Sequence, residues 1–168
     1  MSRRLAWLAL GAALLLGGCG LRPLYSSGTQ GPVSATLRQI DVAPIAGQAG
    51  YLLGNAVRDQ LGTGGGAAPA YRLEVKLDDR IIGLGVRRDD TVTRERRVLR
   101  ARYQLIDLAN GQVVLDATSG WDAGIDVVGS EYATIAAENS ALERLTKIVA
   151  DQIVARIALY ADRQQRRQ

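Results

Sequence analysis

Two stretches of the chain alternate between apolar and charged side chains with a period of two residues. In AYRLEVKLDDRI, residues 70–81, the odd positions from Tyr71 to Leu77 are apolar and the positions between them are charged; RVLRARYQLIDL, residues 97–108, repeats the pattern. Successive side chains of a strand point to opposite faces, so each stretch predicts a β-strand with one buried and one polar face. A sheet built from such strands can bury only one face, and any helix must pack on that face.

Turn and helix signals organise the segments around these two strands. LRQIDVAPI, residues 37–45, predicts a first strand. QAGYLLGNAVRDQL, residues 48–61, carries apolar residues near helical spacing and is followed by Gly62, a typical helix stop. Ala-Asn-Gly at 109–111 predicts a tight turn, because asparagine and glycine tolerate positive φ, and QVVLDATSGW at 112–121 predicts the returning strand.

The C-terminal part of the chain predicts one long amphipathic helix. Ser130 is a suitable N-cap, and Glu131 places a negative charge in the first turn. The stripe weakens at Glu138 and Asn139, where we expect a bend or a change of neighbour. Apolar residues at spacings of three and four form the stripe: Leu142, Leu145, Val149, Ile153, Ile157 and Tyr160.

The order of these elements predicts a fold of the α+β class. Two helices can both bury their apolar stripes only if they cover one face of the sheet. We therefore expect a two-layer sandwich, a four-stranded mixed sheet with two helices on one face, in the order β-α-β-β-β-α. The first strand, the helix and the second strand form a crossover unit that we expect to be right-handed, and the later strands follow as an antiparallel meander.

The N-terminus resembles a bacterial lipoprotein signal. Arg3 and Arg4 precede an apolar segment at residues 5–16, shorter than the roughly 20 residues that a membrane-spanning helix needs. In such signals the chain is cleaved before a cysteine that is then acylated, so the resemblance implies that Cys19 is the site of lipid attachment. Gly20 stands where an aspartate commonly retains lipoproteins in the inner membrane, which implies the outer membrane, periplasmic side. The alternatives are a signal peptide that happens to carry a free cysteine and an uncleaved anchor helix.

These features suggest a simple organisation of the chain. SSGTQGPVSAT, residues 26–36, is small and polar and is typical of a tether. We expect a signal peptide at 1–18, an acylated N-terminus and flexible tether at 19–36, the α+β domain at 37–162 and a basic tail at 163–168.

The composition argues against most catalytic and metal chemistry. The chain has no histidine and one cysteine, so the usual serine and cysteine triads and the common zinc and copper sites lack their residues. Paired carboxylates at Asp78-Asp79 and Asp89-Asp90 are interpreted as solvated turn residues. We predict no metal, no cofactor and no enzymatic activity; a lipid-anchored hydrolase of envelope polymers is the alternative from a different class.

A basic cluster lies between residues 87 and 102, where seven arginines stand against Asp89, Asp90 and Glu95. We expect these arginines at the turn between the second and third strands and along the solvent face of the third. The planar guanidinium suits bidentate contacts to phosphate or carboxylate, so an anionic partner is one interpretation. An exposed strand face that charge protects from edge pairing is the other. Nucleic acid is not expected, because the cluster lacks interleaved aromatic side chains. The candidate contact residues are Arg87, Arg88, Arg94, Arg96 and Arg97.

Several short motifs, in the same order along the chain, resemble the lipopolysaccharide-assembly lipoprotein LptE family, alphaproteobacterial type. They are CGLRPLY at 19–25, APIAG at 43–47, YRLEV at 71–75, GLGVRRDDTVTR at 83–94, RYQLID at 102–107 and SEYATIAAEN at 130–139. The resemblance implies a non-enzymatic outer-membrane lipoprotein that plugs the β-barrel LptD, assists its assembly and helps insert lipopolysaccharide into the outer leaflet. The basic cluster would then contact lipopolysaccharide phosphates or acidic groups of the barrel wall.

One alternative function and one structural expectation follow from this resemblance. An auxiliary lipoprotein of an ABC-type lipid transporter can share the same signal and a similar order of elements. A plug can also expose apolar patches when it is free of its barrel. Candidates for such a patch lie in a segment without clear alternation, with plain core burial as their alternative: Trp121, Ile125, Val127 and Val128.

Overall fold

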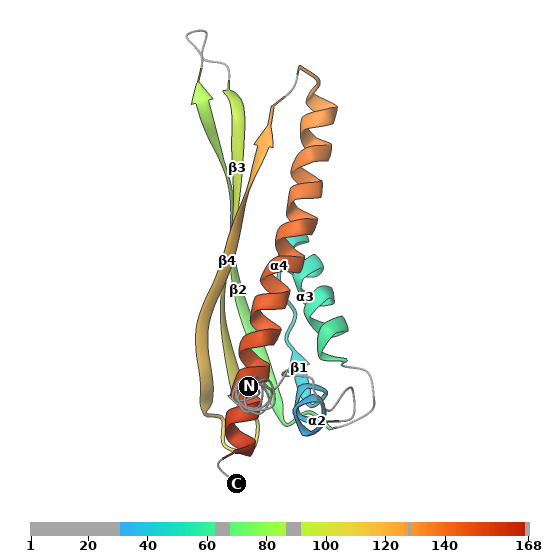
Figure 1. Ribbon diagram of the computed structural model, residues 1–168, viewed down its shortest axis with the longest axis vertical. Helices are drawn as coiled ribbons and strands as arrows, with labels where there is room; N and C mark the ends of the chain where they lie inside the picture. Colours follow the sequence, from blue (N-terminus) through green and yellow to red (C-terminus); the bar gives the residue numbers. More distant parts are fainter. Residues whose placement is uncertain (1–30, 63–67, 87–91, 128, 167–168) are drawn as a thin grey trace, which may run out of the picture.

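A computed structural model describes residues 31–62, 68–86, 92–127 and 129–166 (Figure 1). The elements of this part of the chain, in order, are α2 (Pro32–Leu37), β1 (Ile40–Val42), α3 (Gly47–Leu61), β2 (Tyr71–Val86), β3 (Val92–Asp107), β4 (Val113–Asp126) and α4 (Glu131–Gln165).

The four strands form one mixed sheet in the order β1-β2-β3-β4. β1 pairs with β2 in parallel, and the β2–β3 and β3–β4 pairs are antiparallel. Figure 1 shows α3 and α4 on the same side of the sheet, with α3 beside the middle of α4. The predicted fold class, a two-layer α+β sandwich, is confirmed.

The alternation of β2 and β3 assigns their faces as the sequence predicts. Leu73, Leu99, Tyr103 and Leu105 are buried. The even positions beside them face away from the helices, and four of these are exposed charged residues, Arg72, Glu74, Arg100 and Arg102. Both strands are longer than predicted, and Asp78-Asp79 lies inside β2 rather than at a turn. Asp89-Asp90 lies outside the described residues.

Helix α2 is a correction to the expected tether. Residues 32–36 are helical, with Pro32 in the first turn, where its missing N–H costs nothing. Val33 and Leu37, four residues apart, are both buried in the main hydrophobic core. The ordered domain therefore begins before residue 37.

The predicted helix stop at Gly62 and the predicted turn at residues 109–111 lie where the sequence placed them. Gly62 ends α3 with φ +67°, a left-handed conformation that glycine adopts without strain. The β3–β4 turn contains Gly111 at φ +70°, and Asp107 accepts a hydrogen bond from the backbone N–H of Ala109 at 2.8 Å.

Helix α4 is the longest element of the described chain. The Ser130 hydroxyl accepts a hydrogen bond from the Ala133 N–H at 3.4 Å, which confirms the predicted cap. The helix continues without a break through Glu138 and Asn139 to Gln165, a length of about 50 Å at 1.5 Å per residue. A bend at those two residues is therefore not needed. Their neighbours change instead, since α3 lies further along, beside the middle of α4, where Gln60 of α3 bonds Asp151 (Figure 1).

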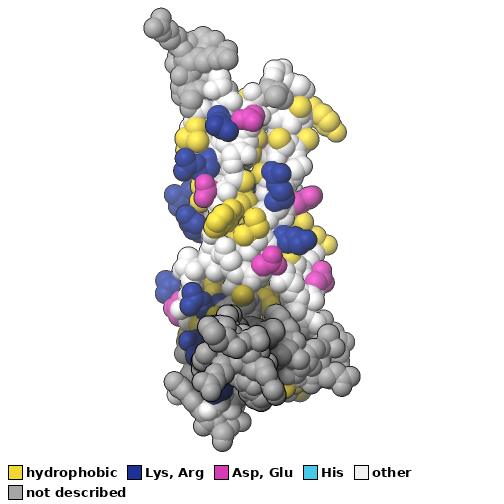
Figure 2. Space-filling model, viewed as in Figure 1, with side chains coloured by type: hydrophobic (Ala, Val, Ile, Leu, Met, Phe, Trp, Pro, Cys, Tyr) yellow, Lys and Arg dark blue, Asp and Glu magenta, His cyan; other side chains and the backbone are white. Residues whose placement is uncertain are grey.

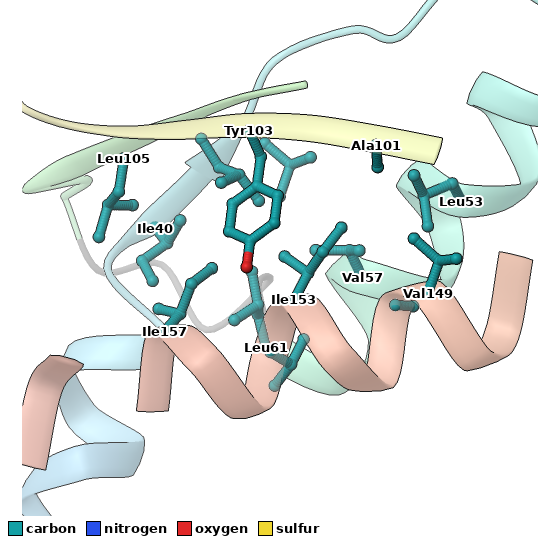
Figure 3. Close-up of a cluster of buried hydrophobic side chains, with 14 of the residues drawn as sticks. Ile40, Leu53, Val57, Leu61, Ala101, Tyr103, Leu105, Val149, Ile153 and Ile157 are labelled. Atoms are coloured by element: carbon teal, nitrogen blue, oxygen red, sulfur yellow. The ribbon is translucent and has the colours of Figure 1, made fainter. Parts of the chain in front are cut away.

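The hydrophobic core fills the space between the sheet and the two long helices. Figure 3 shows the Tyr103 ring pointing from β3 towards α4, with Ile153 and Ile157 of the helix around it. Tyr103 is only 1% exposed. The core therefore fixes α4 across the sheet, and no helix of the described part of the chain covers the opposite face.

Candidate functional site

The outer face of the sheet, the face turned away from α3 and α4, is the candidate site. β3 lies between β2 and β4, and its even-numbered charged residues form a row along the middle of this face. Figure 2 shows basic side chains gathered along the margin of the molecule formed by the sheet, with acidic ones among them. We call the following residues the arginine row: Arg94, Arg96, Arg100 and Arg102.

Most of the arginine row is paired with carboxylates of β4. Arg94 Nε lies 3.2 Å from Asp126 Oδ1, and Arg96 Nε lies 3.9 Å from Asp122 Oδ2. These are single, solvent-exposed contacts, which cost little to rearrange. The sequence predicted a net positive cluster, and the structure adds the compensating carboxylates contributed by the neighbouring strand.

Arg102 is held more firmly than the others. Its Nη2 and Nε donate to the two carboxylate oxygens of Asp116 at 3.0 and 3.3 Å, and Gln104 donates to the same carboxylate at 2.8 Å. The hydrogen bonds from Arg102 and then Gln104 lower the pKa of Asp116. Arg102 is therefore the least available member of the row.

Arg100 makes no ion pair with any residue in the described part of the chain. Its side chain lies across Gly120 of β4, where a Cβ would come within 2.6 Å of Arg100 Cδ. The absence of a side chain at Gly120 makes room for the arginine stem. Sequence reasoning counted Arg100 in the cluster but did not single it out; its even position beside a glycine of the next strand was not visible before the register was known.

Arg97 lies on the other face of the sheet, so its expected place on the solvent face is wrong. Only 9% of the surface of Arg97 is exposed. Nε and Nη2 donate to the two carboxylate oxygens of Asp79 at 2.9 and 2.6 Å, and Nη1 donates to the backbone oxygen of Glu138 at 3.0 Å. The hydrogen bonds to Asp79 raise the pKa of Arg97. This arginine ties β2 and β3 to the N-terminal part of α4.

Glu95 lies two residues before Arg97 on the same face of β3. Its Oε2 is buried and has no hydrogen-bond partner among the residues that the structure describes. Burial, and then the nearby carboxylate of Glu138 on α4, raise the pKa of Glu95. Two carboxylates therefore face each other between the sheet and the helix.

We expect Glu95→Gln to stabilise the protein at neutral pH. Because the pKa of Glu95 is raised, the folded state binds the proton more tightly than the unfolded state. The free energy of unfolding of the wild-type protein then falls as pH rises through and above the ordinary glutamate range, and the penalty persists at neutral pH. Chemical denaturation across this pH range should show a smaller decline in the Glu95→Gln variant. Glu143→Gln, on the exposed surface of α4, is the control; equal slopes for wild type and Glu95→Gln would contradict the assignment.

The remaining predicted residues divide between described and undescribed parts of the chain. Cys19, Arg87, Arg88 and Val128 lie outside the described residues. Of the predicted apolar candidates, Ile125 is buried at 3% exposure and Trp121 is 52% exposed. Val127 is half-buried.

The described part of the chain lacks two features that would suggest other roles. No helix there is both long enough and apolar enough to cross a membrane. No group of three or more potential metal ligands occurs among the same residues.

Several solved structures are similar to this one, and some of them are lipoproteins. A crystal structure of a Caulobacter crescentus protein has 24% sequence identity and a TM-score of 0.67, and the match covers 77% of this chain and 96% of that chain. Rare lipoprotein B from Shewanella oneidensis has 9% identity and a TM-score of 0.59 over 75% of this chain and 98% of that chain. A minor lipoprotein from Acinetobacter baumannii has 14% identity and a TM-score of 0.57 over 73% and 92%. At these identities the matches establish the fold.

The family follows from the sequence model rather than from these structures. No curated protein sequence matches the chain. The family model described as LptE, lipopolysaccharide-assembly, matches residues 37–157, which is most of the chain and nearly all of the described domain. The chain belongs to the LptE family of lipopolysaccharide-assembly proteins.

Proposed function

We propose that this chain is an outer-membrane lipoprotein that plugs the β-barrel LptD, assists its assembly and helps insert lipopolysaccharide into the outer leaflet. Membership of the LptE family carries the proposal. The lipoprotein signal ending at Cys19, followed by Gly20, supports an acyl anchor in the outer membrane, facing the periplasm. No catalytic step is required of the chain in this role.

The uncovered outer face supports a contact with anions. A face without helices can lie against another molecule, and guanidinium groups recognise phosphate and carboxylate through charge-assisted hydrogen bonds. Lipopolysaccharide supplies phosphates, and a barrel wall supplies carboxylates. We infer that the arginine row, with Arg87 and Arg88, is the surface that meets one or both.

The pairing within the row ranks its members. Arg100 has no carboxylate partner among the described residues, and Arg94 and Arg96 have single contacts that an incoming phosphate can replace. Arg97 has all three of its donor nitrogens engaged at Asp79 and Glu138, so we assign it a structural role instead.

Replacing Arg94, Arg96 and Arg100 together with glutamine is expected to weaken lipopolysaccharide binding several-fold and to reduce its dependence on salt. Arg102→Gln, which removes an arginine already held by Asp116, should change binding less. Titration of the tagged protein with fluorescent lipopolysaccharide at two ionic strengths measures both effects. An unchanged affinity in the triple variant would show that this face does not bind lipopolysaccharide.

The test of the function itself is the recovery of LptD with this lipoprotein from solubilised outer membrane. A triple variant that still recovers LptD but has lost lipopolysaccharide binding would separate the lipid contact from the barrel contact.

A further inference from the structure

A groove lies at the end of the domain where the described chain begins. Figure 1 shows α2, the last turns of α4 and the start of β2 together at the lower end of the molecule, and these three elements form the groove. Its volume of about 360 Å³ lies within the range of about 300–1,000 Å³ that is usual for ligand pockets. Its walls include Pro32, Ala35, Gln39, Tyr71, Tyr160 and Gln164.

Helix α2 has one face towards the core and a neighbouring face towards this groove. Val33 and Leu37 are buried in the core. Pro32 and Ala35, three residues apart and so on one side of the helix, line the groove together with Gln39, which follows the helix. The Ala35 side chain is small and exposed, so it leaves the groove open along α2.

Two tyrosines give the groove aromatic walls. Tyr71 and Tyr160 are both half-buried, and they come from different elements, β2 and α4. Burial, and then the neighbouring groups of Tyr160 and Asp107, raise the pKa of Tyr71. The two phenols therefore lie close together at a place that is partly shielded from water.

The polar side chains of the groove are available for new hydrogen bonds. In the described part of the chain, the side chains of Gln39, Tyr71, Tyr160 and Gln164 make no hydrogen bond with another residue. Grooves lined by aromatic rings recognise extended segments that contain proline. An extended segment of this kind has no internal hydrogen bonds, so phenol and amide donors beside the rings can satisfy its backbone carbonyls.

The chain just before α2 contains a segment of this kind. LRPLY, residues 21–25, is the apolar part of an otherwise small and polar stretch that runs from residue 20 to residue 31. Pro23 fixes its own φ and restricts Arg22 to extended conformations. Acylation of Cys19 does not by itself require these apolar residues, so they need another explanation.

The linker between LRPLY and α2 is long enough for the segment to turn back along the helix. Residues 26–31, SSGTQG, are six small or polar residues that include Gly28 and Gly31, and glycine adopts the backbone conformations that a reversal needs. Six residues reach at most about 20 Å, whereas the six residues of α2 span about 9 Å. The groove also begins at Pro32, directly after the linker.

We propose that residues 21–25 dock in this groove. The Pro23 ring lies between the rings of Tyr71 and Tyr160, and the side-chain amides of the groove donate to the backbone carbonyls of the segment. A short tether holds its segment at millimolar effective concentration, so a contact with a dissociation constant of about 0.1 mM fills the groove about 90% of the time. The docking is a property of the mature chain and does not depend on the proposed partnership with LptD.

Docking would shorten the connection between the membrane anchor and the domain. Cys19 lies four residues before Pro23, which places it within about 14 Å of the groove. Acyl chains on Cys19 would then be held beside the end of the domain that carries α2 and the last turns of α4. The domain would stand on the membrane by this end.

Proteolysis of the mature chain with Cys19→Ser, which removes the acylation site, tests the docking. Chymotrypsin cleaves after Tyr25, and the rate at this bond is compared with the rate in a free peptide of residues 19–31. Because only the undocked segment is cleaved, the wild-type chain should be cut about tenfold more slowly than the peptide. Pro23→Ala, measured against its own peptide, should lose most of this protection.

Two substitutions in the domain separate docking from general effects on the fold. Ala35→Arg fills the groove from an exposed position of α2 and should raise the cleavage rate to that of the peptide. Tyr132→Ala changes a residue that is 84% exposed near the other end of α4, so it should leave the protection unchanged. Both positions are exposed, so neither change disturbs the core.

Nuclear Overhauser effects identify the occupant of the groove directly. In the wild-type chain, Pro23 protons should show these contacts to the ring protons of Tyr71 and Tyr160, and Ala35→Arg should remove them. Cleavage of the wild-type chain at the peptide rate, or equal protection in the Ala35→Arg and Tyr132→Ala chains, would overturn the proposal. Contacts from the two rings to a segment other than residues 21–25 would also overturn it.

Discussion

Replacing Arg97 by methionine is expected to lower the free energy of unfolding by about 3 kcal/mol, the largest effect expected for any single charged residue here. The variant leaves the Asp79 carboxylate, only 23% exposed, without its cation. It also removes the hydrogen bond to the Glu138 backbone oxygen, which joins the sheet to α4. Denaturant unfolding measures the loss, and hydrogen exchange should show earlier opening of the N-terminal half of α4.

Two comparisons separate this pair from an ordinary surface ion pair. Arg102→Met removes an equally bidentate contact that is exposed, 65% at Arg102 and 39% at Asp116, and should cost about 1 kcal/mol or less. Changing Asp79→Leu together with Arg97→Met removes both charges and should recover much of the loss. If Arg97→Met costs no more than Arg102→Met, Arg97 does not hold the helix to the sheet.

Replacing Tyr103 by alanine is expected to cost about 4 kcal/mol. The ring is 1% exposed and occupies the space between β3 and α4 shown in Figure 3. Removing the ring leaves a cavity, because the surrounding side chains belong to two different elements and cannot move together to fill it. Thermal and denaturant unfolding of the variant measure the effect.

Tyr132→Ala is the matched control, because Tyr132 is 84% exposed near the start of α4 and its loss should change stability by less than about 0.5 kcal/mol. Tyr103→Phe keeps the ring and loses only a long 3.5 Å hydroxyl contact with Ser119, so it should cost far less than alanine. Similar losses for the alanine variants at positions 103 and 132 would contradict the assigned core.

The alternation of the sequence assigns the face of each residue on β3, including Arg97, which was predicted on the wrong face. Leu99, Tyr103 and Leu105 mark the odd positions as buried. Extended backwards, the same parity assigns Arg97 to the buried face and Arg96 to the outer one. The two arginines were assigned to one cluster because both are charged, but their odd and even positions place them on opposite faces of the sheet. What parity cannot supply is the reason that a buried arginine is tolerated.

That reason lies in contacts between distant parts of the chain. Arg97 reaches Asp79 and Glu138, 18 and 41 residues away, and neither distance carries a local sequence signal. Helix α2 was missed for a related reason. Its small, polar composition is typical of a tether, and only burial of Val33 and Leu37 in the core makes a short helix there stable.

The most direct test of the proposed function is affinity purification of the acylated, C-terminally tagged lipoprotein from detergent-solubilised outer membrane, with bound proteins identified by mass spectrometry. The proposal predicts near-stoichiometric recovery of the β-barrel LptD. Recovery of an ABC-transporter permease in place of the barrel, or of no partner, would contradict it.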